Sequence, residues 1–360
     1  MKISGDTSDP SLARYAPQMR FEPIGQRGQK SLKYAQVVII GCGGLGGVLA
    51  ETLTRAGVGF LHLVDRDFIE IDNLQRQILF DEHDIAASLP KAEAAARKLR
   101  RVNSAVEIKP LVIDFNAANA EEICRDADLI LDGTDNLQTR YLINDTAVKL
   151  DLPWVFGACA GGAGRVLPIL PRETPCLRCI WREPPAGDEP PTAASAGMLA
   201  PIVNVIASLQ ATEVIKILTG NFDALQRSLI EVDIWDGQFQ AIDLQTARRG
   251  DCPCCDHGKY DFLTAPLDPI TPRRIGPATI QLPPPPEIKI DLKRIVIGLP
   301  SGSHPSHSRF LLRFRIDRLN VVIFADGRTI IRGTNDLEAA RKLRDRFLPP
   351  AGEGEAPAEP

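Results

Sequence analysis

The sequence contains no apolar run long enough to cross a membrane and no large excess of charge of either sign. No window approaches 18 consecutive apolar residues, so we expect no spanning helix. The first twenty residues lack the apolar segment of a secretory signal. Lys and Arg number 42 against 46 Asp and Glu, and the net charge of −4 argues against a chain-wide nucleic-acid surface. We therefore expect a cytoplasmic protein with no membrane or nucleic-acid partner.

Aromatic residues are also few, at 6%, and no internal repeat is present. The 44% of hydrophobic and 24% of charged residues are nevertheless typical of a globular protein with a buried core. At about 150 residues per domain, a chain of 360 residues predicts two domains. Because no secretory signal is found, the eight cysteines indicate metal binding or thiol chemistry before disulfides.

Strands and helices alternate along the first two-thirds of the chain. The apolar run 37–40 predicts a strand buried on both faces, and a helix is expected at 45–56. Further strands are expected at 60–64, 106–113, 128–131 and 153–156, with a helix after Pro90. The pattern predicts a doubly wound, Rossmann-like α/β fold with a mostly parallel sheet, to which 228–234 and 238–244 add an antiparallel part.

The chain divides by composition into four parts. We expect an N-terminal helical arm over 1–34, a nucleotide-binding domain over 35–258, a small α+β domain over 259–348 and a disordered tail over 349–360. The small domain is predicted from a strand at 310–316, a hairpin at 321–331 and a helix at 336–347. Residues 201–219 predict a helix that is apolar nearly all round, which indicates a core position or a subunit interface.

A glycine-rich loop joins the first strand to the first helix. Gly41, Gly43 and Gly46 satisfy the pattern G-x-G-x-x-G, with Gly44 between them. Glycine lets the backbone turn tightly and approach a phosphate, and the helix N-terminus offers free N–H groups to the anion. Asp65 closes the second strand, where a carboxylate can accept hydrogen bonds from a ribose. Alone, the loop predicts NAD or FAD binding, or a turn selected only for close packing of helix on strand.

The residues that follow Asp65 do not suit an ordinary dehydrogenase. Asn73, Arg76 and Lys91 can clamp a triphosphate, although each of them is also compatible with a solvated surface position. The segment Asp132-Gly133-Thr134-Asp135-Asn136 ends the fourth strand, where Asp135 can hold Mg²⁺.

The cysteines form two C-x-x-C pairs, Cys176–Cys179 and Cys252–Cys255. Four thiolates in two such pairs suit a tetrahedral structural Zn²⁺ site, with Cys254 as a spare thiol. A redox-active pair or two disulfides are the competing interpretations.

In this order, the motifs resemble those of the ThiF/MoeB/HesA group of ATP-dependent adenylyltransferases, which are relatives of the ubiquitin-activating enzymes. The resemblance covers about Ser11 to Gly258 and rests on GCGGLGG, VDRDFIEIDNLQRQ, PK, DGTDN, CLRC, AGMLAP and CPCC. It implies a homodimer that joins AMP from ATP to the C-terminal glycine of a ubiquitin-like sulfur carrier ending in Gly-Gly, in molybdopterin or thiamine biosynthesis.

The resemblance also implies roles for single residues. The glycines and Asn136 border the nucleotide, and Asp65 meets the ribose. Arg76 and Lys91 would be catalytic together with Asp135, which organises Mg²⁺, and Asn73 would contact phosphate. The two C-x-x-C pairs match the zinc clip of the family.

Two positions depart from the family pattern. Ala193 stands where many members have a cysteine that receives the acyl group or sulfur, so we predict adenylation without covalent transfer through this loop. Cys159 or Cys254 could substitute only if accessible, and a buried status is expected for each. Pro17 replaces an arginine that reaches the partner subunit's ATP, and Arg20 lies one turn further on.

Three other functions stay open at this stage. Pro17 and Ala193 are compatible with a catalytically weakened scaffold that binds ATP or a carrier without turnover. An NAD-dependent oxidoreductase could use the same glycine loop, although NLQRQ and DGTDN disfavour it. An enzyme of the tRNA-threonylcarbamoyladenosine dehydratase type would activate a carboxylate on tRNA, and the two C-x-x-C pairs disfavour that function.

Overall fold

The computed structural model describes residues 10–184, 196–244, 246–248, 250–264, 273–276, 278–284 and 290–348. The chain forms two compact units. The first unit comprises Met1–Asp67, Asp72–Phe80 and Lys91–Ala265. The second unit comprises Phe68–Ile71, Asp81–Pro90 and Pro266–Pro360, so two short segments of the N-terminal half belong to it. The tail expected to be disordered over 349–360 lies outside the described residues.

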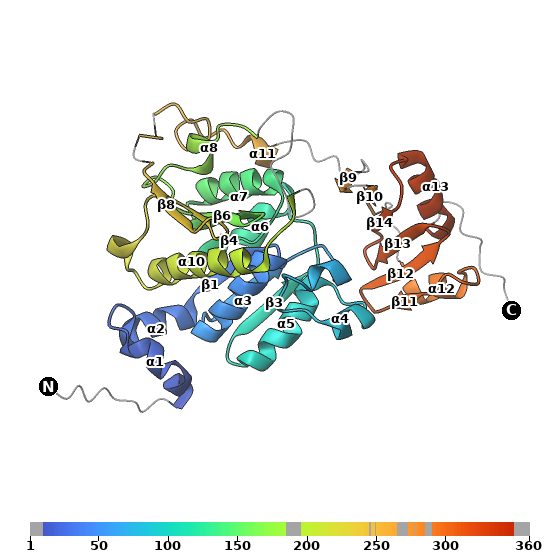
Figure 1. The fold of residues 1–360 in the computed structure, drawn as a ribbon, viewed down its shortest axis with the longest axis horizontal. Coiled ribbons are helices and arrows are strands. Elements are labelled where there is room, and N and C mark those ends of the chain that lie inside the picture. Colours follow the sequence, from blue (N-terminus) through green and yellow to red (C-terminus); the bar gives the residue numbers. More distant parts are fainter. Residues whose placement is uncertain are drawn as a thin grey trace. The chain divides into compact units, whose positions relative to one another are not determined.

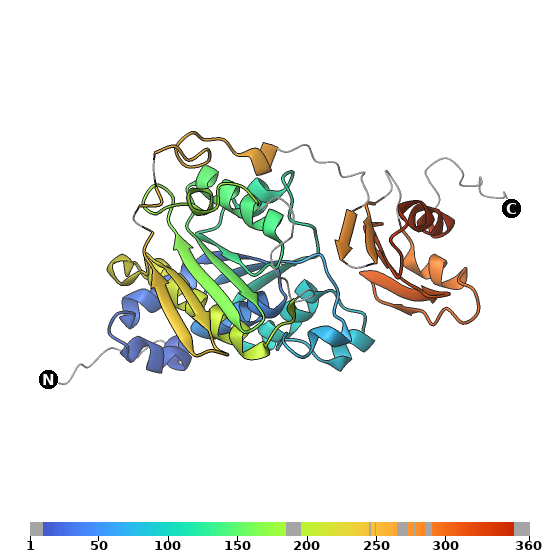
Figure 2. The same ribbon diagram turned by 45° about the horizontal axis from the view of Figure 1, so that its top comes forward.

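An eight-stranded sheet forms the centre of the first unit, in the order β3-β2-β1-β4-β5-β6-β7-β8. The first five strands are parallel: β1 Gln36–Ile40, β2 Phe60–Val64, β3 Glu107–Leu111, β4 Leu129–Asp132 and β5 Trp154–Ala160. Three antiparallel strands extend the sheet (Figure 2): β6 Ala163–Ile169, β7 Leu229–Asp233 and β8 Gln238–Ile242. This arrangement confirms the predicted Rossmann-like sheet with an added antiparallel part.

Helices cover both faces of this sheet (Figure 1). One layer contains α3 Gly44–Ala56, α5 Lys91–Val102 and α10 Ala200–Leu218. The other contains α6 Ala120–Cys124, α7 Leu137–Leu150, α8 Leu177–Ile180 and α11 Asp261–Thr264. The core between the sheet and this second layer includes the fully buried rings of Tyr141 and Trp154. Parallel strands need cover on both faces, which explains the continuous apolar run at 37–40.

Helix α10 is long and apolar enough to meet the length and composition of a membrane span, but half of its apolar window is buried inside the protein. It packs on α3, β5 and β6. Its buried Gln210 donates from Nε2 to the carbonyl oxygens of Asp132 and Val155, which joins β4 to β5. The helix is therefore a core helix of the first unit, which is one of the two positions that its pattern indicated.

The N-terminal arm contains a 3₁₀ turn at Pro10–Tyr15, α1 at Ala16–Arg20 and α2 at Gly25–Tyr34. The sequence predicted a helical arm over 1–34 but no separate helix at α2, which has few apolar residues. Buried polar contacts hold the arm. Asn103 donates from Nδ2 to the hydroxyl of Tyr15 at 2.8 Å, and Gln29 donates to the carbonyl oxygen of Ala56 at 2.9 Å. Pro17 lies in the first turn of α1, where a missing N–H costs nothing.

A six-stranded antiparallel sheet forms the second unit, in the order β11-β12-β13-β14-β10-β9. Its strands are β9 Arg273–Gly276, β10 Thr279–Leu282, β11 Ser306–His307, β12 Leu311–Ile316, β13 Leu319–Phe324 and β14 Thr329–Arg332. α12 Leu292–Ile297 and α13 Leu337–Phe347 pack on one face. The short helix α4, Glu82–Ala86, also belongs to this unit. The strand, hairpin and helix expected after residue 310 are present, whereas β9 and β10 were not predicted.

Strand β6 was also missed, because Gly164 and Pro168 interrupt its apolar pattern. Both residues have a place in the sheet. A Cβ on Gly164 would lie 2.4 Å from the side chain of Ile206 on α10, so glycine permits that helix to pack closely.

Gly46 and Gly47 make a matched pair in α3 that tests how the glycine loop packs. A Cβ at Gly46 would lie 1.8 Å from the carbonyl oxygen of Gly41, whereas one at Gly47 would reach only ordinary contact distance from Leu79. We expect Gly46→Ala to lower the free energy of unfolding by more than about 2 kcal/mol. Gly47→Ala should change it by less than about 1 kcal/mol, since alanine favours a helix. Urea denaturation of both variants measures the difference, and equal stabilities would contradict the packing.

Candidate functional site

A cleft opens at the carboxyl ends of β1 and β4, where the order of the parallel strands reverses. Open α/β sheets bind ligands at such a switch point. The lining includes most of the residues predicted from the sequence: Gly41, Gly43, Gly44, Asp65, Arg76, Lys91, Asp135 and Asn136. Gly46 and Asn73 do not line it. The cleft brings together predicted residues that lie up to 95 positions apart in the sequence, from Gly41 to Asn136.

The glycine loop approaches the end of β4 so closely that side chains would not fit. Gly41 has a φ of +90°, and a Cβ there would lie 2.8 Å from the carbonyl oxygen of Gly133. A Cβ on Gly133 would in turn lie 2.5 Å from the carbonyl oxygen of Gly41. Gly43 has no such clash and faces Gln77 at 3.6 Å. Gly41 and Gly46 therefore serve backbone packing, while Gly43 and Gly44 leave the N-terminus of α3 open to the cleft.

Asp65 holds the glycine loop as well as lining the cleft. Its two carboxylate oxygens accept hydrogen bonds from the backbone N–H groups of Cys42 and Asp67, each at 2.7 Å. Burial raises the pKa of Asp65, and the charge of Lys91 opposes that effect. Each carboxylate oxygen retains a lone pair, so a further hydrogen bond from a ribose hydroxyl remains possible.

Lys91 brings a buried positive charge to the cleft. Its Nζ lies 3.3 Å from Oδ2 of Asp67, and its backbone N–H donates to the carbonyl oxygen of the same residue at 2.8 Å. Burial alone would lower the pKa of Lys91, but Asp67, Asp65 and Asp135 outweigh burial and raise it. The ammonium group therefore stays charged at neutral pH and can meet a polyanion.

Arg76 lines the cleft from the segment after the 3₁₀ turn Ile71–Asn73. One of its terminal nitrogens donates to the carbonyl oxygen of Asp72 at 2.9 Å, which leaves other donors of the guanidinium for an anion. Asn73 is buried, and its amide nitrogen donates to Oδ1 of Asp72 at 3.0 Å. The backbone N–H of Arg76 donates to the carbonyl oxygen of Asn73 at 3.1 Å, so Asn73 also shapes the turn that carries Arg76.

Asp135 is exposed at the start of α7 and lines the cleft. Within the described part of the chain its carboxylate makes no hydrogen bond or ion pair. Asn136 caps α7, because its side-chain oxygen accepts from the N–H of Thr139 at 3.0 Å. An exposed carboxylate that makes no hydrogen bond or ion pair among the described residues suits a hydrated divalent cation.

Gln77 and Arg140 also line the cleft, although neither was among the predicted site residues. Gln77 is buried, and its Oε1 has no hydrogen-bond partner among the described residues. Arg140 pairs with the fully buried Asp132 at 3.1 Å and donates to the carbonyl oxygens of Thr134 and Gly157. Nearness to predicted site residues could have identified both: Gln77 is next to Arg76 in the same motif, and Arg140 lies one helical turn after Asn136.

Cys159 also lines the cleft, near the end of β5. Burial raises the pKa of this thiol to about 12, so it is protonated at neutral pH and a poor nucleophile. Cys254 is fully buried and accepts a hydrogen bond from the amide of Asn144 at 3.4 Å. Cys254 has the buried status expected of it, whereas Cys159 is only partly buried. Ala193 lies outside the described residues.

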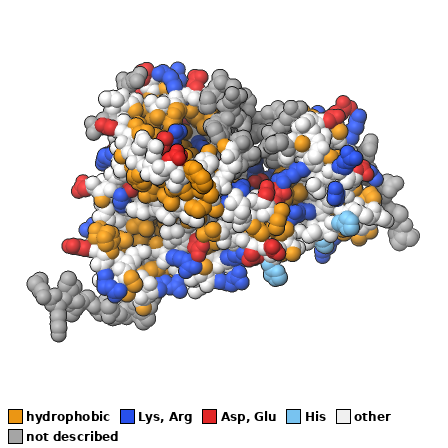
Figure 3. Space-filling model, viewed as in Figure 1, with side chains coloured by type: hydrophobic (Ala, Val, Ile, Leu, Met, Phe, Trp, Pro, Cys, Tyr) orange, Lys and Arg blue, Asp and Glu red, His pale blue; other side chains and the backbone are white. Residues whose placement is uncertain are grey.

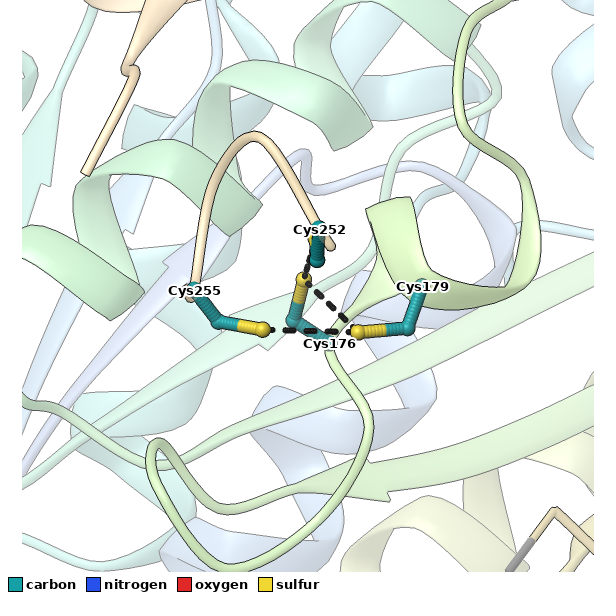
Figure 4. Close-up of side chains that lie close together, drawn as sticks. All are labelled: Cys176, Cys179, Cys252 and Cys255. Carbon is teal, nitrogen blue, oxygen red and sulfur yellow. Dashed lines mark hydrogen bonds between the residues drawn. The ribbon is translucent and has the colours of Figure 1, made fainter. Parts of the chain in front are cut away.

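The four predicted cysteine ligands converge at one place in the first unit (Figure 4). Their Sγ atoms all lie within 4.8 Å of one another, and three pairs are separated by 3.4 to 3.8 Å. A tetrahedron of sulfurs about 2.3 Å from zinc has edges of about 3.8 Å. The cysteines are free thiols, so the cluster fits a zinc ion better than a pair of disulfides. Hydrogen bonds from Cys179, Cys254 and Cys255 lower the pKa of Cys176, which favours its thiolate.

Helix α7 forms hydrogen bonds to both loops that carry the clustered cysteines. The fully buried Asn144 accepts at Oδ1 from the N–H of Leu177 at 2.8 Å and donates from Nδ2 to Cys254. Its neighbour Asp145 accepts from the N–H of Phe262 at 3.0 Å and faces Arg178 at 3.8 Å. The two loops that carry the thiols are therefore held by one rigid helix, as the outer hydrogen bonds of metal sites commonly are.

A model of the ThiF family matches residues 15–254, a stretch that contains the residues lining the cleft and three of the four clustered cysteines. Cys255 lies one residue beyond the match. The chain belongs to the ThiF family. The match ends before the described strands of the second unit's sheet.

Two relatives place this ThiF-family chain more closely. The sulfur carrier protein ThiS adenylyltransferase of Bacillus subtilis (strain 168) is 38% identical over 336 residues, which are 93% of this chain and 99% of that protein. The sulfur carrier protein adenylyltransferase of Thermus thermophilus is 38% identical over 249 residues, which are 68% of this chain and 90% of that protein. The ThiF-family chain is an adenylyltransferase, as the resemblance implied.

A solved structure shares the fold of this ThiF-family enzyme. The crystal structure of E. coli MccB with MccA-N7isoASN superimposes with a TM-score of 0.60. It covers 70% of this chain and 76% of that chain at 23% sequence identity, which shows a common fold and nothing further.

Cys254 and Cys255 are neighbours that differ in their expected role. We expect Cys255→Ser to lose the bound metal and to melt at a lower temperature, because a structural zinc ion contributes directly to folding. Cys254→Ser should retain one zinc per chain, since its sulfur is outside the four-thiol group. Elemental analysis and thermal melts of purified variants measure both effects. Metal-free wild-type protein, whose melt does not respond to a chelator, would contradict the assignment.

Proposed function

We propose that this protein adenylates the C-terminal glycine of a ubiquitin-like sulfur carrier ending in Gly-Gly, in thiamine or molybdopterin biosynthesis. The proposal rests on one observation: the N-terminus of α3, Arg76 and Lys91 all line the same cleft. The names of the two relatives support the carrier as substrate. The agreement with the Bacillus subtilis protein over nearly its whole length favours a ThiS-type carrier of thiamine biosynthesis.

The cleft accounts for how ATP would be held. Asp65 would accept from the ribose, and the triphosphate would lie between α3 and the cations Arg76 and Lys91. Gln77 can donate to the same phosphates while its Oε1 remains inside the cleft. Ile113 and Phe115 line the cleft beyond β3, where an apolar surface suits the adenine ring.

The reaction would be an in-line displacement at the α-phosphate. The carrier's carboxylate oxygen attacks the α-phosphorus, the bond to the bridging oxygen of the β-phosphate breaks, and pyrophosphate leaves with that oxygen. Because negative charge moves onto pyrophosphate, Arg76 and Lys91 stabilise the transition state more than the bound ATP. Proximity supplies the rest of the acceleration, since the cleft holds both reactants.

Two metal ions fit the proposal. Asp135 would hold Mg²⁺ against the phosphates, where the ion supplies positive charge for the leaving pyrophosphate. Zn²⁺ in the four-cysteine cluster would be structural, because all four positions of its tetrahedron are taken by thiolates.

The surface of the first unit offers a place for protein partners. Figure 3 shows hydrophobic side chains gathered over α10 and the antiparallel strands. Trp235 and Phe239 are exposed on the β7–β8 turn and on β8, the edge strand of the sheet. On α10, Val205 and Leu209 lie one turn apart and are half-buried. We place the carrier at the sheet edge and the partner subunit of a homodimer along α10. We expect the enzyme to act in the cytoplasm.

Lys91 and Arg97 on α5 provide a matched test of the proposal. Lys91→Met should lower ATP–pyrophosphate exchange by about 100-fold or more, because it removes the buried charge of the cleft. Arg97→Met should leave exchange within about twofold, since Arg97 is half-exposed and pairs with Glu93 one turn away. The assay uses the wild-type enzyme with candidate carriers ending in Gly-Gly. No exchange with any of them would refute the proposed function.

We expect the acyl adenylate to pass onward without a thioester to this enzyme. Ala193 has no thiol, and Cys159 is protonated at neutral pH. Incubation with ATP and carrier, followed by non-reducing electrophoresis and mass spectrometry, should show no conjugate that a reductant releases. A reducible enzyme–carrier conjugate that disappears in Cys159→Ser would contradict this expectation and identify the acceptor.

A further inference from the structure

The second compact unit includes two segments that are adjacent in sequence to residues lining the cleft; we call them the bordering segments. Phe68–Ile71 and Asp81–Pro90 belong to this unit, while Asp72–Phe80 between them belongs to the first. Arg76 and Gln77 lie on that intervening segment. Asp67 and Lys91, which also line the cleft, are the residues directly before the first bordering segment and directly after the second. The chain therefore passes between the units at four points around the residues that would hold phosphate.

The first bordering segment is held by a face of the second sheet. Side chains alternate along antiparallel strands, so Leu311, Val322, Phe324 and Ile330 lie opposite the face covered by α12 and α13. The buried Phe68 completes this second core, with its ring 6.3 Å from that of Phe324.

Two arginines of the same face strengthen the contact. The guanidinium carbons of Arg313 and Arg332 lie 5.1 Å and 5.5 Å from the centre of the Phe68 ring. Arg332 also forms an ion pair with Glu70, two residues further along the segment. Cation–π contacts of partly buried arginines add to the apolar packing, and the ion pair fixes the direction in which the segment leaves.

The second bordering segment is held by hydrogen bonds. Ser88, which is almost fully buried, shares a hydrogen bond with Ser306 at 2.5 Å. The hydroxyl of Ser308 donates to the carbonyl oxygen of Ser88 at 2.9 Å. Phe68 and Pro90 form an antiparallel β-bridge, so the two segments are also joined to each other at their outer ends. Strand β11 and the residue that follows it thus anchor the chain just before the start of α5.

We propose that the C-terminal unit is a positioning element for the phosphate-binding residues of the cleft. By holding Phe68–Ile71 and Asp81–Pro90, it restrains both ends of the segment that carries Arg76 and Gln77 and the start of the helix that carries Lys91. A loop whose ends are both fixed has fewer conformations to lose when it binds, so nucleotide binds more tightly. The inference rests on the proposed function in that the cleft holds ATP. Phe68 is a positioning residue and does not touch the nucleotide.

Two phenylalanines of the second unit make a matched test. Phe68 lies in the core that holds the bordering segment, and Phe314 lies in the core under α13, 5.0 Å from Phe347. Both are buried, so substitution by leucine removes similar packing from the same unit. We expect Phe68→Leu to raise the KM for ATP about tenfold and to leave the KM for the carrier unchanged. Phe314→Leu should leave both constants within about twofold.

The ion pair supplies a second set of variants if Phe68→Leu does not fold. E70R and R332E each place like charges together and should raise the KM for ATP about threefold. The double variant E70R/R332E restores the opposite charges and should return the KM close to the wild-type value. A structural defect in the second unit alone would not be rescued in this way.

Hydrogen–deuterium exchange of the full-length protein without nucleotide gives a readout that does not depend on activity. Asp72–Phe80 should exchange faster in Phe68→Leu than in wild type or Phe314→Leu. Equal exchange and equal KM values in the two leucine variants would overturn the inference. A wild-type protein that neither binds ATP nor exchanges pyrophosphate would overturn the proposed function. The hydrogen–deuterium exchange of Phe68→Leu and Phe314→Leu would still decide whether the C-terminal unit restrains Asp72–Phe80.

Discussion

The close backbone contact between the glycine loop and the end of β4 is the constraint on which the cleft depends. Gly41, Gly46 and Gly133 meet at distances that no Cβ would allow, and the contact brings the N-terminus of α3 beside the loop after β4. Asp65 then holds the loop through the N–H of Cys42. The terminus of α3, the carboxylate of Asp65 and Asp135 therefore line one cleft, because three residues lack side chains.

Helix α7 relates the cleft to the cysteine cluster. Asn136 caps the helix, and Arg140 pairs with the buried Asp132 one turn later. After another turn, Asn144 bonds to both loops that carry the thiols. A helix is rigid over this length, so the metal-binding loops and the edge of the cleft are built on the same support.

The second unit changes how the longest motif of the sequence is understood. VDRDFIEIDNLQRQ looks like one nucleotide-binding signature, but its middle, Phe68–Ile71, is part of a different core. The Thermus thermophilus relative matches 68% of this chain and the Bacillus subtilis relative matches 93%, so the two relatives differ in how much of the chain they match. In this chain the second unit includes the segments on either side of Asp72–Phe80, which carries the cleft residues Arg76 and Gln77.

The sequence alone determined the Rossmann-like sheet, the cleft at the glycine loop and the four cysteines, because strand periodicity, glycine spacing and C-x-x-C pairs are local patterns. It did not reveal β6, since Gly164 and Pro168 hide its strand character, or α2, which has few apolar residues. Tertiary structure decided which residues line the cleft: the lining includes Gln77 and Arg140 but not Gly46 or Asn73. It also decided that Phe68 joins the C-terminal core, because a contact between residues more than 240 positions apart depends on how the whole chain folds.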